Sequence, residues 1–391
     1  MATIVENSTA CTANDIADAA VRLHSHLLRA HWNGETVAGP DPGIRFNARI
    51  GRFIKSYARW LPWSDSIVYA QAQKYWILCN WLMADLSLVD AERCREMNLA
   101  CTEYLLRAQR PEGYWEYPNR EWKGRIATVE GNYASMALLA TYQHEPDERY
   151  LEGAEKWYRF ATENIGFRKS GEGLAINYFG NHGSMMVPNN AASALRVFSW
   201  LAKAAGDDQY LEYCGPMVTF LRDVQLDSGE LPYGVAWAES GAKDRIHFLC
   251  QQYNAFQFLN LADYHSTTGD EEVVPVLSGL AQFICKSLRP NGASRYDCHK
   301  ATPEVPYYTL ASGAALTRAT ELCIGDYAQP AERAYRRVLS QQCPDGNMRF
   351  YSTRNYRLLR DRRSYPRYLS MILYHLLLRV KTLQPAFSAN S

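Results

Sequence analysis

The chain has almost no net charge: among its 391 residues, 42 Lys and Arg face 41 Asp and Glu, which leaves a formal charge of +1. A general nucleic-acid-binding protein would show a basic excess, so no nucleic-acid partner is expected. No apolar stretch reaches the length of about 18 residues that a membrane span needs. The first residues, MATIVENSTACTAND, do not contain a basic segment followed by an apolar one. These absences predict a cytoplasmic protein with no membrane span.

The ten cysteines include no CxxC pair. Cys79, Cys101, Cys250 and Cys285 lie inside apolar helical patterns, which is typical of small buried side chains in a reducing compartment. We therefore expect no cysteine metal site. Nothing else in the sequence has the spacing of a metal or cofactor site, so none is predicted.

What the sequence does contain is a repeat. RPEGYWEYP, GEGLAINYF, DSGELPYGV, PNGASRYDC and PDGNMRFYS each place an aromatic residue four or five positions after a glycine. These glycines are Gly113, Gly173, Gly229, Gly292 and Gly346. Acidic turns such as HEPDERY and TGDEEV fall between them. Two markers in each repeat indicate two helices in each repeat.

The two helices of a repeat differ in character. Those after the glycine loops are apolar on all sides and predict an inner ring, and those after the acidic turns have one charged face and predict an outer ring. Inner helices are expected to start near Ser66, Val129, Val187, His247, Tyr307 and Tyr368. A helix over 14–31 can supply the missing outer partner. We predict an all-α fold, a single (α/α)6 toroid over 1–385 with short β-hairpin-like loops at one mouth, and a disordered tail over 386–391; an open helical solenoid is the alternative.

Segments such as YLLRAQRPEGYWEY and VLSQQCPDGNMRFY resemble the repeat of the terpenoid-cyclase and protein-prenyltransferase superfamily. Its outer helices end in Gln before a turn that carries an aromatic residue. The acidic turns are similar to those of glucuronyl C5-epimerases and sugar 2-epimerases, which share the toroid. This resemblance covers roughly residues 66 to 380. It is specific for architecture and says little about chemistry.

The six long loops that lead into the inner helices should gather at one end of the toroid. The inner helices also begin there, and their N-termini carry partial positive charge. The last loop, Gly346 to Tyr368, contains seven arginines and one acid. We expect Arg354, Arg357 and Arg363 to bind an anionic group of a substrate. The alternative is that they pair with acids of neighbouring loops, such as Glu116, Glu121 and Glu239.

Aromatic and amide side chains should line the same mouth. Trp115 and Tyr117 are candidates for stacking against a sugar, although a ring at a repeat position can also plug the gap between hairpins. Amides at the starts of inner helices would be costly against a hydrocarbon ligand and suit hydroxyl groups instead. The predicted binding residues in this group are Asn189, Asn190, Gln252 and Tyr308.

Candidates for proton transfer fall into three groups. Glu130 and Tyr133 lie one turn apart at the start of an inner helix, Tyr178 and His182 share a loop, and Tyr296, Asp297 and His299 follow one another in SRYDCHK. In an extended loop, Asp297 and His299 would point to the same side as a coupled acid and base. The alternatives are a dipole-stabilised carboxylate for Glu130 and ordinary loop residues for the others.

These observations favour an enzyme that acts on an anionic, uronate-type saccharide by general acid–base chemistry. Epimerisation or β-elimination fits better than hydrolysis, although Glu130 with Asp297 or Glu304 would supply the two carboxylates of a glycosidase. One alternative is an isoprenoid cyclase or transferase, but the DxDD and DDxxD motifs of those enzymes are absent. A non-catalytic toroid that binds a glycan or a protein is the other.

Overall fold

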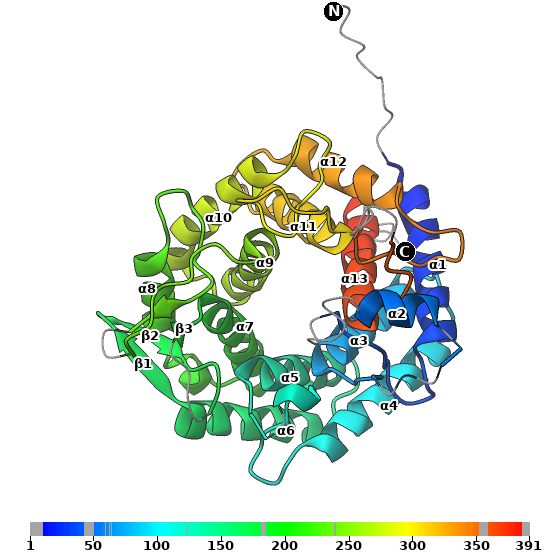
Figure 1. Ribbon diagram of the computed structural model, residues 1–391. Helices are drawn as coiled ribbons and strands as arrows, with labels where there is room; N and C mark the ends of the chain where they lie inside the picture. The colour runs from blue at the N-terminus through cyan, green and yellow to red at the C-terminus, as the bar shows by residue number, and fades with distance from the viewer. Residues whose placement is uncertain are drawn as a thin grey trace, which may run out of the picture.

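The computed structural model describes residues 11–42, 51–58, 60–61, 63, 65–122, 124–180, 185–237, 240–351 and 359–384. In this part of the chain, six inner helices surround the axis of a ring and six outer helices surround them (Figure 1). The predicted (α/α)6 toroid is therefore confirmed. The predicted tail over 386–391 lies outside the described residues.

The inner helices are buried on nearly every side, as their apolar sequences predicted. They are α3 (Ala70–Asp85), α5 (Thr128–Tyr142), α7 (Pro188–Ala205), α9 (Cys250–Thr268), α11 (Pro306–Glu321) and α13 (Pro366–Leu383). Three of them begin with proline, which suits the first helical position because its missing N–H has no partner there. Within the described chain, none of the six has a hydrogen bond from its own N-cap side chain.

The outer helices bury one face and expose the other. They are α1 (Ala13–Ala30), α4 (Ala91–Ala108), α6 (Glu148–Arg159), α8 (Cys214–Val224), α10 (Val274–Ser287) and α12 (Ala328–Leu339). In contrast to the inner helices, several are capped by their own side chains, such as Thr12 at α1, Asp90 at α4 and Asp147 at α6. Among the described helices of the ring, capping by a helix's own N-cap side chain is thus found in the outer layer and not in the inner one.

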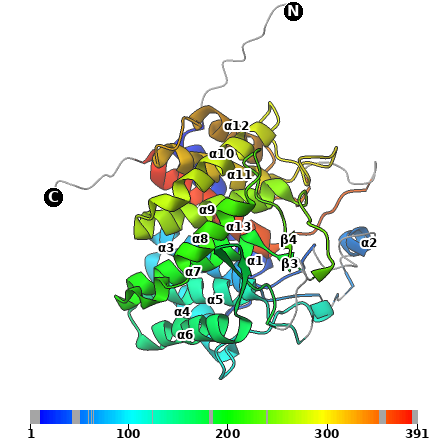
Figure 2. The ribbon, with the colours of Figure 1, turned by 90° about the vertical axis from the view of Figure 1, so that its left-hand side faces the viewer.

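The connections into the inner helices gather at one end of the ring (Figure 2). They contain α2 (Gly51–Tyr57), two small antiparallel sheets and short single-turn helices. One sheet pairs β1 (Phe167–Ser170) with β2 (Gly173–Ile176), and the other pairs β3 (Met185–Met186) with β4 (Val235–Ala236). The short helices η1 (Arg120–Trp122) and η2 (Phe160–Ile165) belong to these connections, whereas η3 (Asp208–Leu211) and η5 (Glu271–Val273) lie in the turns from α7 to α8 and from α9 to α10. The β-hairpin-like loops expected at one mouth are therefore present.

The ring is closed by the two ends of the chain. Helix α1 packs beside α13 and lies between α12 and α4 in the outer ring (Figure 1). The amide Nε2 of Gln342, after α12, donates to the carbonyl oxygen of Ala19 in α1 at 2.8 Å. The helix predicted over 14–31 thus takes the place of a sixth outer helix.

The repeat has a physical basis in this packing. Gln109 and Gln225 make the same two bonds as Gln342, each donating to the carbonyl of the glycine four residues later and to a carbonyl of the next outer helix. The glycine itself is pressed against that helix. At Gly229, a Cβ atom would lie 2.1 Å from the carbonyl oxygen of Gly279, and its φ of +83° also disfavours other residues.

Replacing Gly229 with Ala is expected to lower the free energy of unfolding by roughly 3 kcal/mol or more, because overpacking adds to the backbone strain. Gly206 is the matched control: its φ is +66°, but a Cβ atom there would meet nothing within 4 Å beyond its neighbours in the chain. Its replacement with Ala should cost only about 1 kcal/mol. Denaturant unfolding of both variants measures the difference, and equal losses would show that the contact with Gly279 is unimportant.

One expectation about the cysteines was wrong. Cys250, at the start of α9, was predicted to be a free buried thiol, but it forms a disulfide with Cys298, with Cα atoms 6.4 Å apart. The bond joins the start of α9 to the loop before α11. The sequence pattern did not indicate this disulfide, because 48 positions separate the two cysteines.

Among the described residues, no helix is long and apolar enough to cross a bilayer.

Candidate functional site

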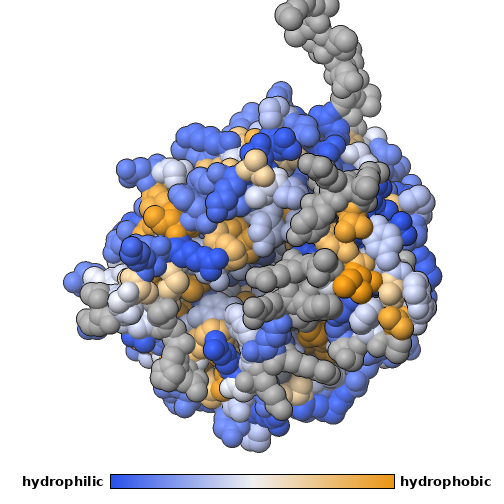
Figure 3. Space-filling model, in the orientation of Figure 1, coloured by the Kyte–Doolittle hydropathy of each residue, from blue (hydrophilic) through white to orange (hydrophobic). Residues whose placement is uncertain are grey.

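A cavity of about 620 Å³ opens at the loop end of the toroid, on its axis. Its wall consists of the first turns of the inner helices and of the loops before them. Figure 3 views this end, where hydrophobic and hydrophilic residues alternate around a hollow. Ten tyrosines of the described chain contribute to the lining, together with the amides of Gln71, Asn119, Asn189 and Gln252. Most of the rings therefore carry a hydroxyl group, and the lining can form many hydrogen bonds.

Glu130 lies in the wall of this cavity, in the first turn of α5. Its Oε1 accepts a hydrogen bond of 2.7 Å from the backbone N–H of Ala70, so it caps the neighbouring inner helix α3. The residue is only 5 % exposed. Burial raises its pKa to about 7, against the opposing effects of the Ala70 N–H and the charge of Arg367. A carboxyl group with this pKa can donate or accept a proton near neutral pH.

Tyr133, one turn after Glu130, also faces the cavity. Its hydroxyl oxygen accepts a hydrogen bond of 3.2 Å from the Gln71 amide. Burial raises the pKa of Tyr133 to about 12, partly offset by the charges of Arg196 and Arg367. The phenol is therefore protonated at neutral pH and suited to donating a proton or a hydrogen bond.

Arg367 lies at the second position of the inner helix α13. Its Nε lies 3.0 Å from Oδ2 of Asp41, and both side chains line the cavity. It also donates to the hydroxyl of Tyr368 at 2.6 Å and lies over the ring of Tyr69. Because Asp41 is 2 % exposed, this ion pair is shielded from water and fixes the guanidinium in place.

Among the described residues of the lining, Arg52 and Arg245 join Arg367, so three arginines face the two carboxyl groups of Asp41 and Glu130. The guanidinium carbon of Arg245 lies 3.6 Å from the ring centre of Phe248, and the Arg52 guanidinium lies over the ring of Tyr351. No carboxylate of the described chain forms an ion pair with Arg245. This exposed side chain is thus the most accessible cation of the lining.

Half of the predicted site residues line the cavity. The structure brings together Glu130, Tyr133, Tyr178, Tyr296, Tyr117, Asn189, Gln252 and Tyr308. They come from α5, α7, α9 and α11 and from the loops before these helices. This is a consequence of the closed ring, which places the starts of all inner helices around one axis.

Other predicted residues lie elsewhere. Trp115 is buried between hairpins, donates from its indole N–H to the carbonyl of Leu105 and packs near Trp157. Asn190 is fully buried in the first turn of α7. Neither residue lines the cavity. Both side chains are buried in the packing of the helices and loops instead.

Asp297 and His299 do not act as a pair. The Asp297 carboxylate accepts a hydrogen bond from the backbone N–H of His299, so the loop turns here and is not extended. The His299 ring instead contacts Glu230. Glu304, the other carboxylate considered for a glycosidase, forms a buried ion pair with Arg337. In the described part of the lining, the second carboxylate is that of Asp41, which sequence reasoning missed.

The arginine-rich loop contributes differently from the prediction. Arg363 donates two hydrogen bonds of 2.9 Å to the carboxylate of Asp65, whose pKa falls to about 2 because the bonds and charges of Arg363 and Lys55 outweigh its burial. It is therefore held away from the cavity. Arg354, Arg357 and His182 lie outside the described residues. Among the described residues of this segment, Arg367 lines the cavity, and its position directly after the proline that starts α13 was the available signal.

No family model matches this sequence, and no curated protein matches it. The fold is similar to solved structures at low identity. A possible member of the GH105 family from Salmonella enterica shares 13% identity at a TM-score of 0.67, covering 98% of this chain and 100% of that one. A polysaccharide lyase shares 12% at 0.67, with 96% and 99% covered. An unsaturated glucuronyl hydrolase specific for heparin shares 12% at 0.67, with 95% and 97% covered. These likenesses establish the toroidal fold.

Proposed function

We propose that this protein is a carbohydrate-active enzyme that acts on an anionic, uronate-type saccharide by general acid–base chemistry. The observation on which this depends is Glu130, a buried carboxyl group with a pKa of about 7 beside an arginine in a cavity rich in hydroxyl and amide groups. The similar solved structures, which include a polysaccharide lyase and a glucuronyl hydrolase, are in accord with this substrate class. An isoprenoid substrate receives no such support.

The arrangement suits proton transfer at the carbon next to a carboxylate. An arginine that binds the substrate carboxylate stabilises the negative charge that develops when this carbon loses its proton. Arg245 is accessible for this role, and the N-termini of the inner helices add partial positive charge. Glu130 in its ionised form accepts the proton, and the protonated Tyr133 donates one. Return of a proton gives epimerisation, and loss of the substituent on the adjacent carbon gives β-elimination.

The experiment that tests this function is incubation with uronate-containing oligosaccharides in deuterated water. Deuterium at C5 of a uronate without chain cleavage indicates an epimerase, and an unsaturated product indicates a lyase. New reducing ends with neither deuterium at C5 nor an unsaturated product would replace both with hydrolysis, for which Asp41 and Glu130 provide two carboxylates. Turnover of no saccharide, together with binding of an isoprenoid diphosphate, would contradict the proposal as a whole.

Replacing Arg245 with Ala is expected to raise KM for an anionic saccharide by about 10- to 100-fold, because a charge-assisted hydrogen bond of about 1.5–3 kcal/mol is lost. Binding of the corresponding neutral sugar should change little. Arg168 provides a matched control: its guanidinium lies 3.6 Å from the ring centre of Trp237, the same distance as in Arg245, but it does not line the cavity. Equal effects of the two substitutions on KM would exclude Arg245 from substrate binding.

A further inference from the structure

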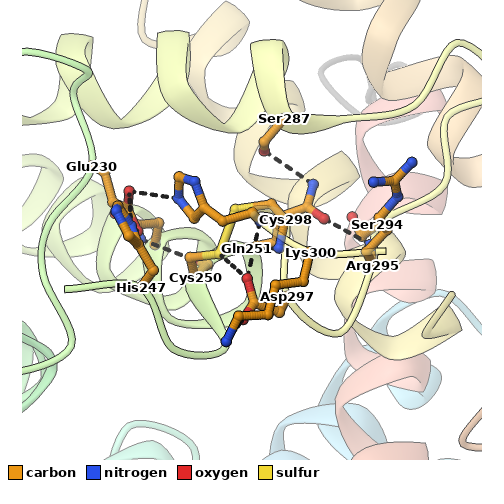
Figure 4. The surroundings of a disulfide bond; sticks show 12 residues. Glu230, His247, Cys250, Gln251, Ser287, Ser294, Arg295, Asp297, Cys298 and Lys300 are labelled. Atoms are coloured by element: carbon orange, nitrogen blue, oxygen red, sulfur yellow. Dashed lines mark hydrogen bonds and ion pairs between the residues drawn. A yellow bond between two sulfur atoms is a disulfide. The ribbon is translucent and has the colours of Figure 1, made fainter. Parts of the chain in front are cut away.

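A cluster of one carboxylate and two imidazoles that do not line the cavity lies in the loops before α9 and α11. Glu230 is buried, and its Oε2 lies 3.1 Å from Nδ1 of His247 and 3.0 Å from Nε2 of His299. The ring centres of the two histidines are 3.7 Å apart. Figure 4 shows Glu230 and His247 directed toward each other beside the disulfide of Cys250 and Cys298.

Glu230 is unusual for its position in the repeat. It directly follows a repeat glycine, and the corresponding residues of the other repeats are Tyr114, Leu174, Ala293 and Asn347. The packing of the repeat therefore does not require an acid here. Its side chain is 1 % exposed, and in the described chain its ion-pair partners are the two histidines, with no Lys or Arg. A carboxylate buried in this way needs a positive charge nearby.

The geometry is that of three ligands around one cation. Carboxylate oxygens and imidazole nitrogens bind Zn²⁺ at about 2.0–2.2 Å, which places two donor atoms of a tetrahedral site about 3.3 Å apart. The two oxygen-to-nitrogen distances at Glu230 are close to this value, and all three donor atoms lie within 4.8 Å of one another. A metal ion also explains two imidazoles in contact, since it binds them in their neutral form.

We propose that Glu230, His247 and His299 bind a divalent transition-metal ion, with zinc the best match to this ligand set. The side chains of His247 and His299 are 45 % and 37 % exposed, so water can occupy the remaining coordination position. The ion joins the loop before α9 to the loop before α11, as the neighbouring disulfide does. These loops carry Arg245 and Tyr296, so metal binding holds one wall of the cavity in place. This site does not depend on what the cavity binds.

The test is Zn²⁺ binding to the full chain after removal of metal with a chelator. Isothermal titration should give one Zn²⁺ per chain, and Zn²⁺ should raise the unfolding temperature. Glu230→Gln, which preserves the shape of the side chain, and His247→Ala should each weaken binding by at least about 100-fold and abolish the thermal shift. Circular dichroism of the metal-free variants checks that each remains folded, and Co²⁺ provides an absorption spectrum of the ligand set.

Two controls make the outcome decisive. His265→Gln changes a histidine outside the cluster, one whose Nδ1 contacts the Asp270 carbonyl, and should bind Zn²⁺ like the parent protein. Cys250→Ser removes the sulfur that lies near His299 and should also bind Zn²⁺ normally. Equal affinity in the parent, Glu230→Gln and His247→Ala proteins would overturn the proposal. Loss of binding in Cys250→Ser with retention in Glu230→Gln would overturn it too, by assigning the metal to the cysteines.

Discussion

Replacing Glu130 with Gln is expected to lower kcat by about 10²- to 10⁴-fold, the range in which a single general acid or base acts. Gln keeps the size of the side chain and an oxygen that can accept from the Ala70 N–H, so substrate affinity should stay within a few-fold of the parent value. Steady-state kinetics and a direct binding measurement on the same saccharide give the two quantities. Undiminished kcat would remove Glu130 from the mechanism.

The pH dependence of the activity provides a second test of the role of Glu130. As a base, Glu130 must be ionised, so the activity of the parent protein should fall as the pH drops below about 7. The residual activity of Glu130→Gln should lack this inflection. An inflection that persists in the variant would assign it to another residue.

Stability should change in the opposite direction from activity. The folded-state pKa of Glu130 is raised from 4.5 to about 7, so its contribution is fully present below pH 4.5 and is lost as the pH rises through 7. At pH 8 the buried charge costs on the order of 3 kcal/mol, at about 1.4 kcal/mol for each unit of pKa. Glu130→Gln is therefore expected to unfold at higher denaturant concentration than the parent at pH 8, and at a similar one at pH 4.5.

Replacing Arg367 with Met is expected to destabilise the protein by roughly 3 kcal/mol, because it removes the arginine that neutralises the buried Asp41. The double variant Asp41→Asn, Arg367→Met should recover part of this loss, since the buried charge is then gone. Urea unfolding of the two single variants and the double variant measures the coupling between the residues.

A surface ion pair provides the comparison for this experiment. Arg95 bonds to Glu145 with both side chains at least 31 % exposed, so Arg95→Met should leave the denaturant midpoint nearly unchanged. If Arg367→Met costs as little as Arg95→Met, or if the double variant is no more stable than Arg367→Met, the ion pair does not stabilise this end of the toroid.

The ring was predictable because its signals are local. Gly113, Gly229 and Gly346 mark turns in which a positive φ and a close contact with the next outer helix both demand glycine. Glutamines four residues earlier bind the same turns. The turn of each repeat can therefore be predicted from a few neighbouring residues. The inner position of the apolar helices between the turns is predicted by their composition.

The cavity was predictable only where its residues lie at the starts of inner helices. Glu130, Asn189 and Gln252 follow from helix position alone. The partners of the arginines do not, because Asp65 and Asp41 are about 300 residues away from Arg363 and Arg367 in the sequence. The prediction that Asp297 and His299 point to the same side of an extended loop was also wrong. The Asp297 carboxylate accepts from the backbone N–H of His299 two residues later, and this bond bends the loop.

The junction between α1 and α13 affects how the protein is made. During synthesis, α1 emerges long before α13, the helix against which it packs. Its apolar residues Ile16, Leu23 and Leu27 are fully buried in the finished ring. They cannot be buried against α13 until that helix has been synthesised. Native assembly is thus completed only after translation of α13, and chains stopped before it leave this apolar face of α1 without its partner helix.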